Sequence, residues 1–181
     1  MQKILIIIIG IAVIILGTWL FSIAGQNSPT NAKKNGSDFD KFAHITIVDY
    51  NGNTVSLEEF KGMPLVINSW AVWCPFCRAE LPDFAELQKE FGDRLVVIAI
   101  DRQEPLEKAK GYTDELNITN DMIFLLDSSD TFYKSISGFS MPETIFVNSA
   151  GEIVVHKRGP MELDEMREYA NKIISTNEVS L

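Results

Sequence analysis

The chain contains two cysteines, Cys74 and Cys77, separated by Pro75 and Phe76. An apolar run at 65–67 precedes them and is typical of a buried strand, and the residues after them have the apolar spacing of a helix. The cysteines therefore lie where a strand turns into a helix, with Pro75 at the first helical position. Unpaired N–H groups and the helix dipole lower the pKa of a thiol there. We predict that Cys74 attacks and that Cys77, one turn deeper, resolves.

Two other roles for a cysteine pair fit this sequence less well. A zinc site needs four ligands, and the two histidines, His44 and His156, have no ligand spacing to each other or to the cysteines. A purely structural disulfide over so short a loop would constrain little of the unfolded chain. The pair is therefore interpreted as a redox-active dithiol that needs no metal and no cofactor beyond the Cys74–Cys77 disulfide itself.

Two segments carry a family resemblance. Residues 68–82, NSWAVWCPFCRAELP, together with residues 141–144, MPET, are similar to TlpA/ResA-like membrane-anchored thiol-disulfide oxidoreductases of the thioredoxin superfamily. The resemblance extends over about residues 42–174. It implies a thioredoxin-like α/β fold, with a mixed central sheet flanked by helices, an N-terminal β-hairpin and one N-terminal transmembrane helix.

The resemblance also implies a proton carrier beside the cysteines. Glu80 lies three residues after Cys77, on the same face of a helix, and the glutamate at this position in ResA-like proteins manages the protons of the cysteines. Asn68 takes the position of a buried aspartate in thioredoxins proper, and an amide cannot exchange a proton there. We therefore assign a catalytic role to Glu80; the alternative is a solvated helix carboxylate.

The third implication concerns substrate docking. The bond between Met141 and Pro142 resembles the cis-proline loop of the family, which faces the dithiol and pairs with an extended substrate. Gly159 is expected on the rim of this surface, and the basic residues 156–158 are interpreted as a solvated strand end. The predicted substrate-binding residues are Trp73, Pro75, Phe76, Met141 and Pro142.

The pair between the cysteines leaves the direction of electron flow open. Many relatives have proline second, whereas here Pro75 precedes Phe76, an order similar to that of glutaredoxins and periplasmic oxidases. Reductants and oxidants of this fold differ in potential by about 150 mV. Two residues do not decide a difference of that size.

The N-terminal segment predicts a membrane anchor. Residues 4–24 are apolar and uncharged over a length that crosses a bilayer as one helix, although a signal peptide cleaved near 22–24 remains an alternative. Lys3 precedes the run, so we expect the N-terminus in the cytoplasm and the catalytic domain outside it, as in a single-pass protein of the cell membrane. We therefore divide the chain into an anchor at 1–24, a flexible linker at 25–40 and a thioredoxin-like domain at 41–181.

The rest of the sequence predicts alternating strands and helices. Residues 38–181 carry 13 basic and 25 acidic side chains, which disfavours nucleic acid as a partner. Apolar runs and turn residues indicate an α/β sandwich. The expected strands lie in a hairpin near 45–55, at 63–70, 95–100 and 122–126, and in a second hairpin at 144–155. The expected helices are a short one opened by a capping box at 56–59, one that follows the cysteines and reaches 91 with a kink at Pro82, one at 104–116, a short one capped by Asp127 or Ser128 and ending at 136, and one at 164–175.

Three function classes follow from these observations. The first is a membrane-tethered thiol-disulfide oxidoreductase outside the cytoplasm, which by resemblance reduces disulfides of exported proteins such as apocytochrome c and exchanges electrons with a membrane donor or acceptor; a variant oxidises exported thiols instead. The second is a peroxiredoxin-like peroxidase, although Ile67 and Val72 do not supply its upstream Pro-and-Thr pattern. The third is a copper-delivery module, which would need a methionine or histidine site near the cysteines.

Overall fold

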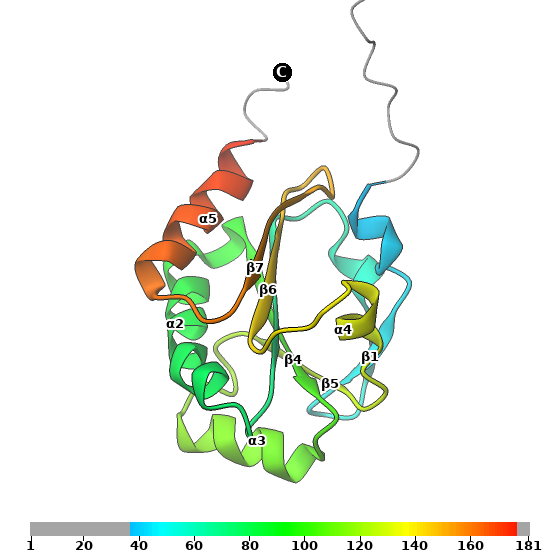
Figure 1. Cartoon of the computed structure of the whole chain (residues 1–181), viewed down its shortest axis with the longest axis vertical. Coiled ribbons are helices and arrows are strands. Elements are labelled where there is room, and N and C mark those ends of the chain that lie inside the picture. Colours follow the sequence, from blue (N-terminus) through cyan, green and yellow to red (C-terminus); the bar gives the residue numbers. More distant parts are fainter. Residues whose placement is uncertain (1–36, 177–181) are drawn as a thin grey trace, which may run out of the picture. The chain divides into compact units, whose positions relative to one another are not determined.

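The computed structural model describes residues 37–176, which contain one seven-stranded sheet in the order β2-β1-β5-β4-β3-β6-β7 (Figure 1). The strands are β1 (Thr46–Asp49), β2 (Thr54–Ser56), β3 (Leu65–Trp70), β4 (Val96–Arg102), β5 (Ile123–Asp127), β6 (Glu143–Val147) and β7 (Ile153–Arg158). The helices are α2 (Pro75–Phe91), α3 (Leu106–Glu115), α4 (Thr131–Ser135) and α5 (Leu163–Ser175), with short 3-10 helices η1 (Phe39–Lys41), η2 (Leu57–Phe60) and η3 (Gly92–Arg94).

The sheet is mixed, as predicted. Strands β3, β4 and β5 are parallel, whereas β1, β2, β6 and β7 join antiparallel neighbours. All residues of β3 are buried, because helices cover both faces of this central strand. The carboxyl end of β3 leads directly into the loop that carries the cysteines.

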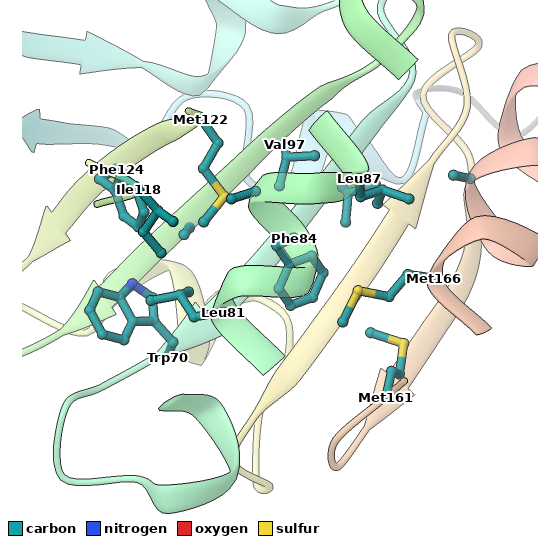
Figure 2. Packing of buried hydrophobic residues seen from close by; sticks show 14 of the residues in the cluster. Trp70, Leu81, Phe84, Leu87, Val97, Ile118, Met122, Phe124, Met161 and Met166 are labelled. Carbon is teal, nitrogen blue, oxygen red and sulfur yellow. The ribbon is translucent and has the colours of Figure 1, made fainter. Parts of the chain in front are cut away.

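The two faces of the sheet have separate apolar cores. On one face, Val66 and Trp70 of β3 pack with residues of α2, α3 and α5. Figure 2 shows this core, in which Phe84 and Leu81 of α2 point toward the sheet. On the other face, Leu65 of β3 packs with residues of η1, η2 and α4. Successive side chains of a strand point to opposite faces of the sheet, so only every second residue of β3 and β6 lies on the face that carries the cysteines.

The predicted N-terminal hairpin and capping box are both present. β1 and β2 pair antiparallel, and the side chain of Asp49 accepts hydrogen bonds from the backbone N–H groups of Asn51 and Asn53 in the turn. Ser56 and Glu59 form a reciprocal capping box at the start of η2. Local sequence signals were sufficient for these elements because their partners lie within a few residues.

Two predicted boundaries are wrong. The linker was predicted to extend to residue 40, but Phe39 is buried in the second core and its N–H donates to the oxygen of Gly151 at 2.9 Å. Phe39 therefore ties this polar stretch to the domain, together with contacts such as the one between Asp40 and Lys61. The short helix that Asp127 or Ser128 was predicted to cap begins later, at Thr131, because Asp130 adopts a left-handed conformation while the Asp127 carboxylate accepts the N–H of Phe132.

The predicted anchor at 1–24 and the linker up to residue 36 lie outside the described residues. Among residues 37–176, no helix combines the length and the apolar character that crossing a bilayer requires.

Candidate active site

Cys74 and Cys77 form a disulfide at the start of α2, with their Cα atoms 5.3 Å apart. Cys74 is the N-cap residue, Pro75 occupies the first turn, and the Cys74 sulfur accepts the backbone N–H of Cys77 at 3.1 Å. The thiolate form of Cys74 would therefore have an N–H donor and the positive end of the helix dipole beside it. Cys74 is 3% exposed and Cys77 is fully buried, so a partner can approach only through Cys74.

Glu80 is buried one helical turn after Cys77, not solvated. Its two oxygens accept hydrogen bonds at 3.0 Å, from the Asn68 amide and from the backbone N–H of Met161. Burial raises the pKa of Glu80 to about 8, although these two hydrogen bonds oppose the shift. A carboxyl group with such a pKa can both accept and release a proton near neutral pH.

Asn68 links Glu80 to the cis-proline segment. Its amide nitrogen donates to both Glu80 and the Thr144 hydroxyl, each at 3.0 Å, and its Oδ1 is buried with no hydrogen-bond partner among residues 37–176. The amide therefore holds the Glu80 carboxyl in place without competing for its proton. Sequence reasoning noted the amide substitution at Asn68 but missed the contacts of Thr144 and Met161, which come from elements distant in the chain.

The Met141–Pro142 bond is cis, as predicted. The N–H of Gly159 donates to the Pro142 oxygen at 2.9 Å, which places Gly159 beside this loop. Met141 packs against the core cluster that contains Cys74 and Cys77. Within the described residues, the backbone N–H and C=O of Met141 form no hydrogen bond, so both are available to an extended chain.

The loop around the cysteines exposes large aromatic side chains. Trp73 is 56% exposed and Phe76 is 62% exposed, whereas Trp70, only three residues before Trp73, is fully buried against α3 and β5. An exposed tryptophan and phenylalanine on either side of a buried cysteine form an apolar surface through which a partner would reach the disulfide.

A second buried glutamate, Glu143, lies directly after the cis-proline and was missed by sequence reasoning. One of its oxygens accepts the N–H groups of Phe139 and Ser140 at 3.0 and 3.1 Å. The other contacts His156 at 2.6 Å and Arg158 at 3.2 Å. The interpretation of residues 156–158 as a solvated strand end is therefore wrong for His156, whereas the Arg158 side chain is 40% exposed while it pairs with Glu143. A charged residue between a proline and an apolar strand was the available signal.

A third carboxylate holds the loop before the cysteines. The Glu104 side chain accepts the backbone N–H of Val72 at 2.5 Å and contacts Lys108. Its neighbour Asp101, at the end of β4, accepts the N–H of Glu104 at 3.1 Å, and burial raises the pKa of Asp101. Asp101 and Glu104 thus fasten the active-site loop to the connection between β4 and α3. This role was also missed, since it depends on the pairing of β3 with β4.

Comparisons with known proteins agree with this geometry. A family model described as Redoxin matches residues 33–174. "Thiol-disulfide oxidoreductase ResA" of Bacillus thuringiensis subsp. konkukian is 23% identical over 131 residues, which cover 72% of this chain and 75% of the relative.

Solved structures share the fold. A Mycobacterium tuberculosis disulfide oxidoreductase, described as secreted and homologous to E. coli DsbE, matches with a TM-score of 0.67 and 20% identity, over 74% of this chain and 98% of that one. The exposed lipoprotein thioredoxin Etrx1 of Streptococcus pneumoniae matches with a TM-score of 0.59 and 27% identity, over 71% and 98%. The fold is therefore thioredoxin-like, as the resemblance implied.

Proposed function

Because the chain belongs to the redoxin family and is a thiol-disulfide oxidoreductase, we propose that it reduces disulfides of exported proteins while tethered to the outer side of the cell membrane. The observation that carries the proposal is the disulfide between Cys74 and Cys77 at the start of α2, with the buried carboxyl of Glu80 one turn further along. Its relatives of the ResA group support the same chemistry, in agreement with the resemblance seen in residues 68–82.

The first step is attack by the reduced enzyme. The Cys74 thiolate attacks one sulfur of the client disulfide, so that a bond forms between Cys74 and the client while the client's own disulfide bond breaks. The departing client sulfur leaves as a thiolate and takes a proton from solvent. The N–H of Cys77 and the dipole of α2 stabilise the attacking charge on Cys74.

The second step releases the client and needs a base. The Cys77 thiol is buried and must lose its proton before it attacks Cys74. Side chains three residues apart on a helix have Cβ atoms about 5–6 Å apart, so Glu80 in its ionised form is placed to take this proton. Cys77 then forms the disulfide with Cys74, and the client leaves with both of its sulfurs reduced. Two electrons have passed from the enzyme to the client.

The proposal places this reaction outside the cytoplasm. The uncharged run at 4–24 is long enough for an anchor, and the solved relative from Streptococcus pneumoniae is described as an exposed lipoprotein. The oxidised enzyme then needs two electrons from a membrane protein that carries them across the bilayer. Exported disulfide proteins, such as apocytochrome c, are the proposed clients.

Client docking uses the exposed face beside the disulfide. Trp73 and Phe76 provide apolar contacts, and an extended client segment pairs with the free backbone groups of Met141 next to Pro142. These residues orient the client sulfur in line with Cys74.

Trapping tests the proposal. A Cys77→Ser variant of the full chain cannot resolve the mixed disulfide, so clients remain joined to Cys74 and can be identified by mass spectrometry after non-reducing electrophoresis. The Cys74→Ser variant, which lacks the attacking sulfur, is the control. We expect the trapped proteins to be exported proteins whose own disulfide was attacked by Cys74. Capture of a membrane oxidase would instead assign the opposite electron flow, and an empty trap with normal cell function would contradict the proposal.

A further inference from the structure

Phe139 is the most exposed large apolar side chain among the described residues, at 76%. It lies two residues before Met141 in the loop that leads to the cis-proline. Because Glu143 pairs with Ser69 near the end of β3, residues 139–142 lie beyond that end, at the edge of the sheet where Trp73 also emerges. Three exposed aromatic residues, Trp73, Phe76 and Phe139, therefore belong to the segments next to this end of β3.

A buried carboxylate and a partly exposed guanidinium hold the loop that carries Phe139. The Glu143 carboxylate accepts the N–H groups of Phe139 and Ser140. The Arg158 guanidinium, which pairs with Glu143, lies over the Phe139 ring with its Cζ atom 4.7 Å from the centroid. These contacts hold both the backbone and the ring of Phe139, so the ring is presented to solvent in one orientation.

A second set of contacts holds the other side of this loop. The Tyr133 hydroxyl donates to the Ser140 oxygen at 2.8 Å, and Arg102 stacks on the Tyr133 ring while pairing with Asp130 through two bonds of 2.7 Å. A Cβ atom at Gly138 would overlap the Tyr133 ring, so only glycine fits there. The loop is thus fastened from α4 and β4 as well as from β7.

We infer that Phe139, positioned by Glu143, is a specificity-determining residue that binds a large apolar side chain of the client next to its reactive cysteine. This inference rests on the proposed function. The charges around Phe139 are paired within the protein: Arg158 with Glu143, and Arg102 with Asp130. The surface that remains for a client is the uncharged ring, which favours an apolar residue over a charged one.

The geometry also indicates where in the client sequence the apolar residue that contacts Phe139 lies. An extended client that pairs with Met141 presents every second side chain to the same face and advances about 3.3 Å per residue. Since Phe139 lies two residues from Met141, it faces a client residue about two or three positions from the reactive cysteine. The inference therefore concerns one position of the client rather than its overall hydrophobicity.

Peptide exchange tests this selection. Two cysteine peptides that differ only in Leu or Ser at that position are each joined to 2-nitro-5-thiobenzoate, and the reduced full-length enzyme is added in excess. The released 2-nitro-5-thiobenzoate is coloured, so its absorbance reports attack by Cys74. Varying the concentration of the enzyme gives both the concentration at half-saturation and the maximal rate of release. The wild type is expected to favour the Leu peptide by about 10-fold at half-saturation, as burial of one apolar side chain allows. Phe139→Ser is expected to remove this preference and leave the maximal rate unchanged.

The controls separate this inference from the proposed function. Met63→Ser removes another exposed apolar side chain, just before β3 at the opposite end of that strand, and should keep the full preference. Glu143→Gln should raise half-saturation for the Leu peptide more than for the Ser peptide, and exchange of the wild type with a small aromatic disulfide gives the reference rate. If the wild type had the same half-saturation for both peptides, or if the preference survived in Phe139→Ser, the role of Phe139 would be overturned while the proposed function would stand. Failure of the wild type to reduce even the small disulfide would overturn the proposed function, and with it this inference.

Discussion

Glu80 and Glu143 are two buried glutamates at the same end of the sheet, but they lie on opposite faces and have different hydrogen-bond donors. Glu80 is on the face covered by α2 and α5, where its donors are a neutral amide and a neutral N–H. Glu143 also accepts two backbone N–H groups, but Arg158 and His156 contact its second oxygen. Thr144, next to Glu143 in β6, faces the other way and contacts Asn68.

This difference separates the proposed proton carrier, Glu80, from a structural anchor, Glu143. A buried carboxyl group with only neutral partners is destabilised in its charged form, which is why the pKa of Glu80 rises to about 8. A buried carboxylate with a cation beside it is compensated as an ion and can hold a loop by accepting backbone N–H groups. In the proposed mechanism, the same residue type therefore serves catalysis on one face and client positioning on the other, and substitutions should affect the two in different ways.

The largest expected effect is on stability. Glu143→Ala removes the acceptor of the N–H groups of Phe139 and Ser140 and the partner of Arg158, whose side chain is 40% exposed and is hydrated in part, so we expect a loss of about 3 kcal/mol in the free energy of unfolding. Urea denaturation measures it. Glu165→Ala is the matched control, because Glu165 pairs with Lys157 of the same strand in a more exposed setting and should cost about 1 kcal/mol or less. Similar losses in both variants would contradict the role of Glu143 as an anchor.

The next effect is on turnover. Glu80→Gln keeps the volume of the side chain but removes the proton acceptor, so release of the client by Cys77 should slow by about 100-fold, or roughly 2.7 kcal/mol of activation free energy. Stopped-flow detection of the mixed disulfide separates this step from attack by Cys74. Glu86→Gln, an exposed carboxylate on the same helix, is the control. If release stays fast while only thermal stability changes, Glu80 is structural and the comparison with Glu143 fails.

The contrast between these glutamates also shows what the sequence could predict. Cys74, Cys77 and Glu80 lie on one helix, and their relation follows from the helical repeat alone. The central strands and both hairpins were predictable for the same reason, because periodicity and turn residues act over short distances.

Long-range contacts were not predictable in this way. The partners of Glu143 are two N–H groups in the preceding loop and side chains 13 and 15 residues later, which meet only when β6 and β7 pair. Likewise, Glu104 reaches Val72 only because β3 and β4 are neighbours. The predicted end of the linker at residue 40 was wrong for the same reason. One apolar residue, Phe39, in a polar stretch does not indicate that it packs into a core formed by distant elements.

A further effect appears gradually, as a slope of stability against pH. Between about pH 5 and 8, folded Glu80 keeps a proton that the unfolded chain has released, so the free energy of unfolding should fall as pH rises, by about 1.4 kcal/mol per unit. The slope should end above pH 8. Glu80→Gln removes this contribution, whereas a raised pKa at Asp101 leaves a background slope in both proteins. Denaturation at a series of pH values in wild type and variant measures the difference, and parallel curves would show that Glu80 is charged in the folded state.

The smallest expected effect tests which partner compensates Glu143. In His156→Gln, the amide can donate to Glu143 in place of the imidazole, while Arg158 and the two N–H groups remain, so the cost should stay below about 1 kcal/mol. Arg158→Met removes the cation and also its contact with Phe139, so it should cost more in stability and in client binding. If instead the two substitutions cost the same, hydrogen-bond geometry rather than charge would hold the loop. Glu143 would then differ from Glu80 only in the number of its donors, and a carboxylate would not be required at that position.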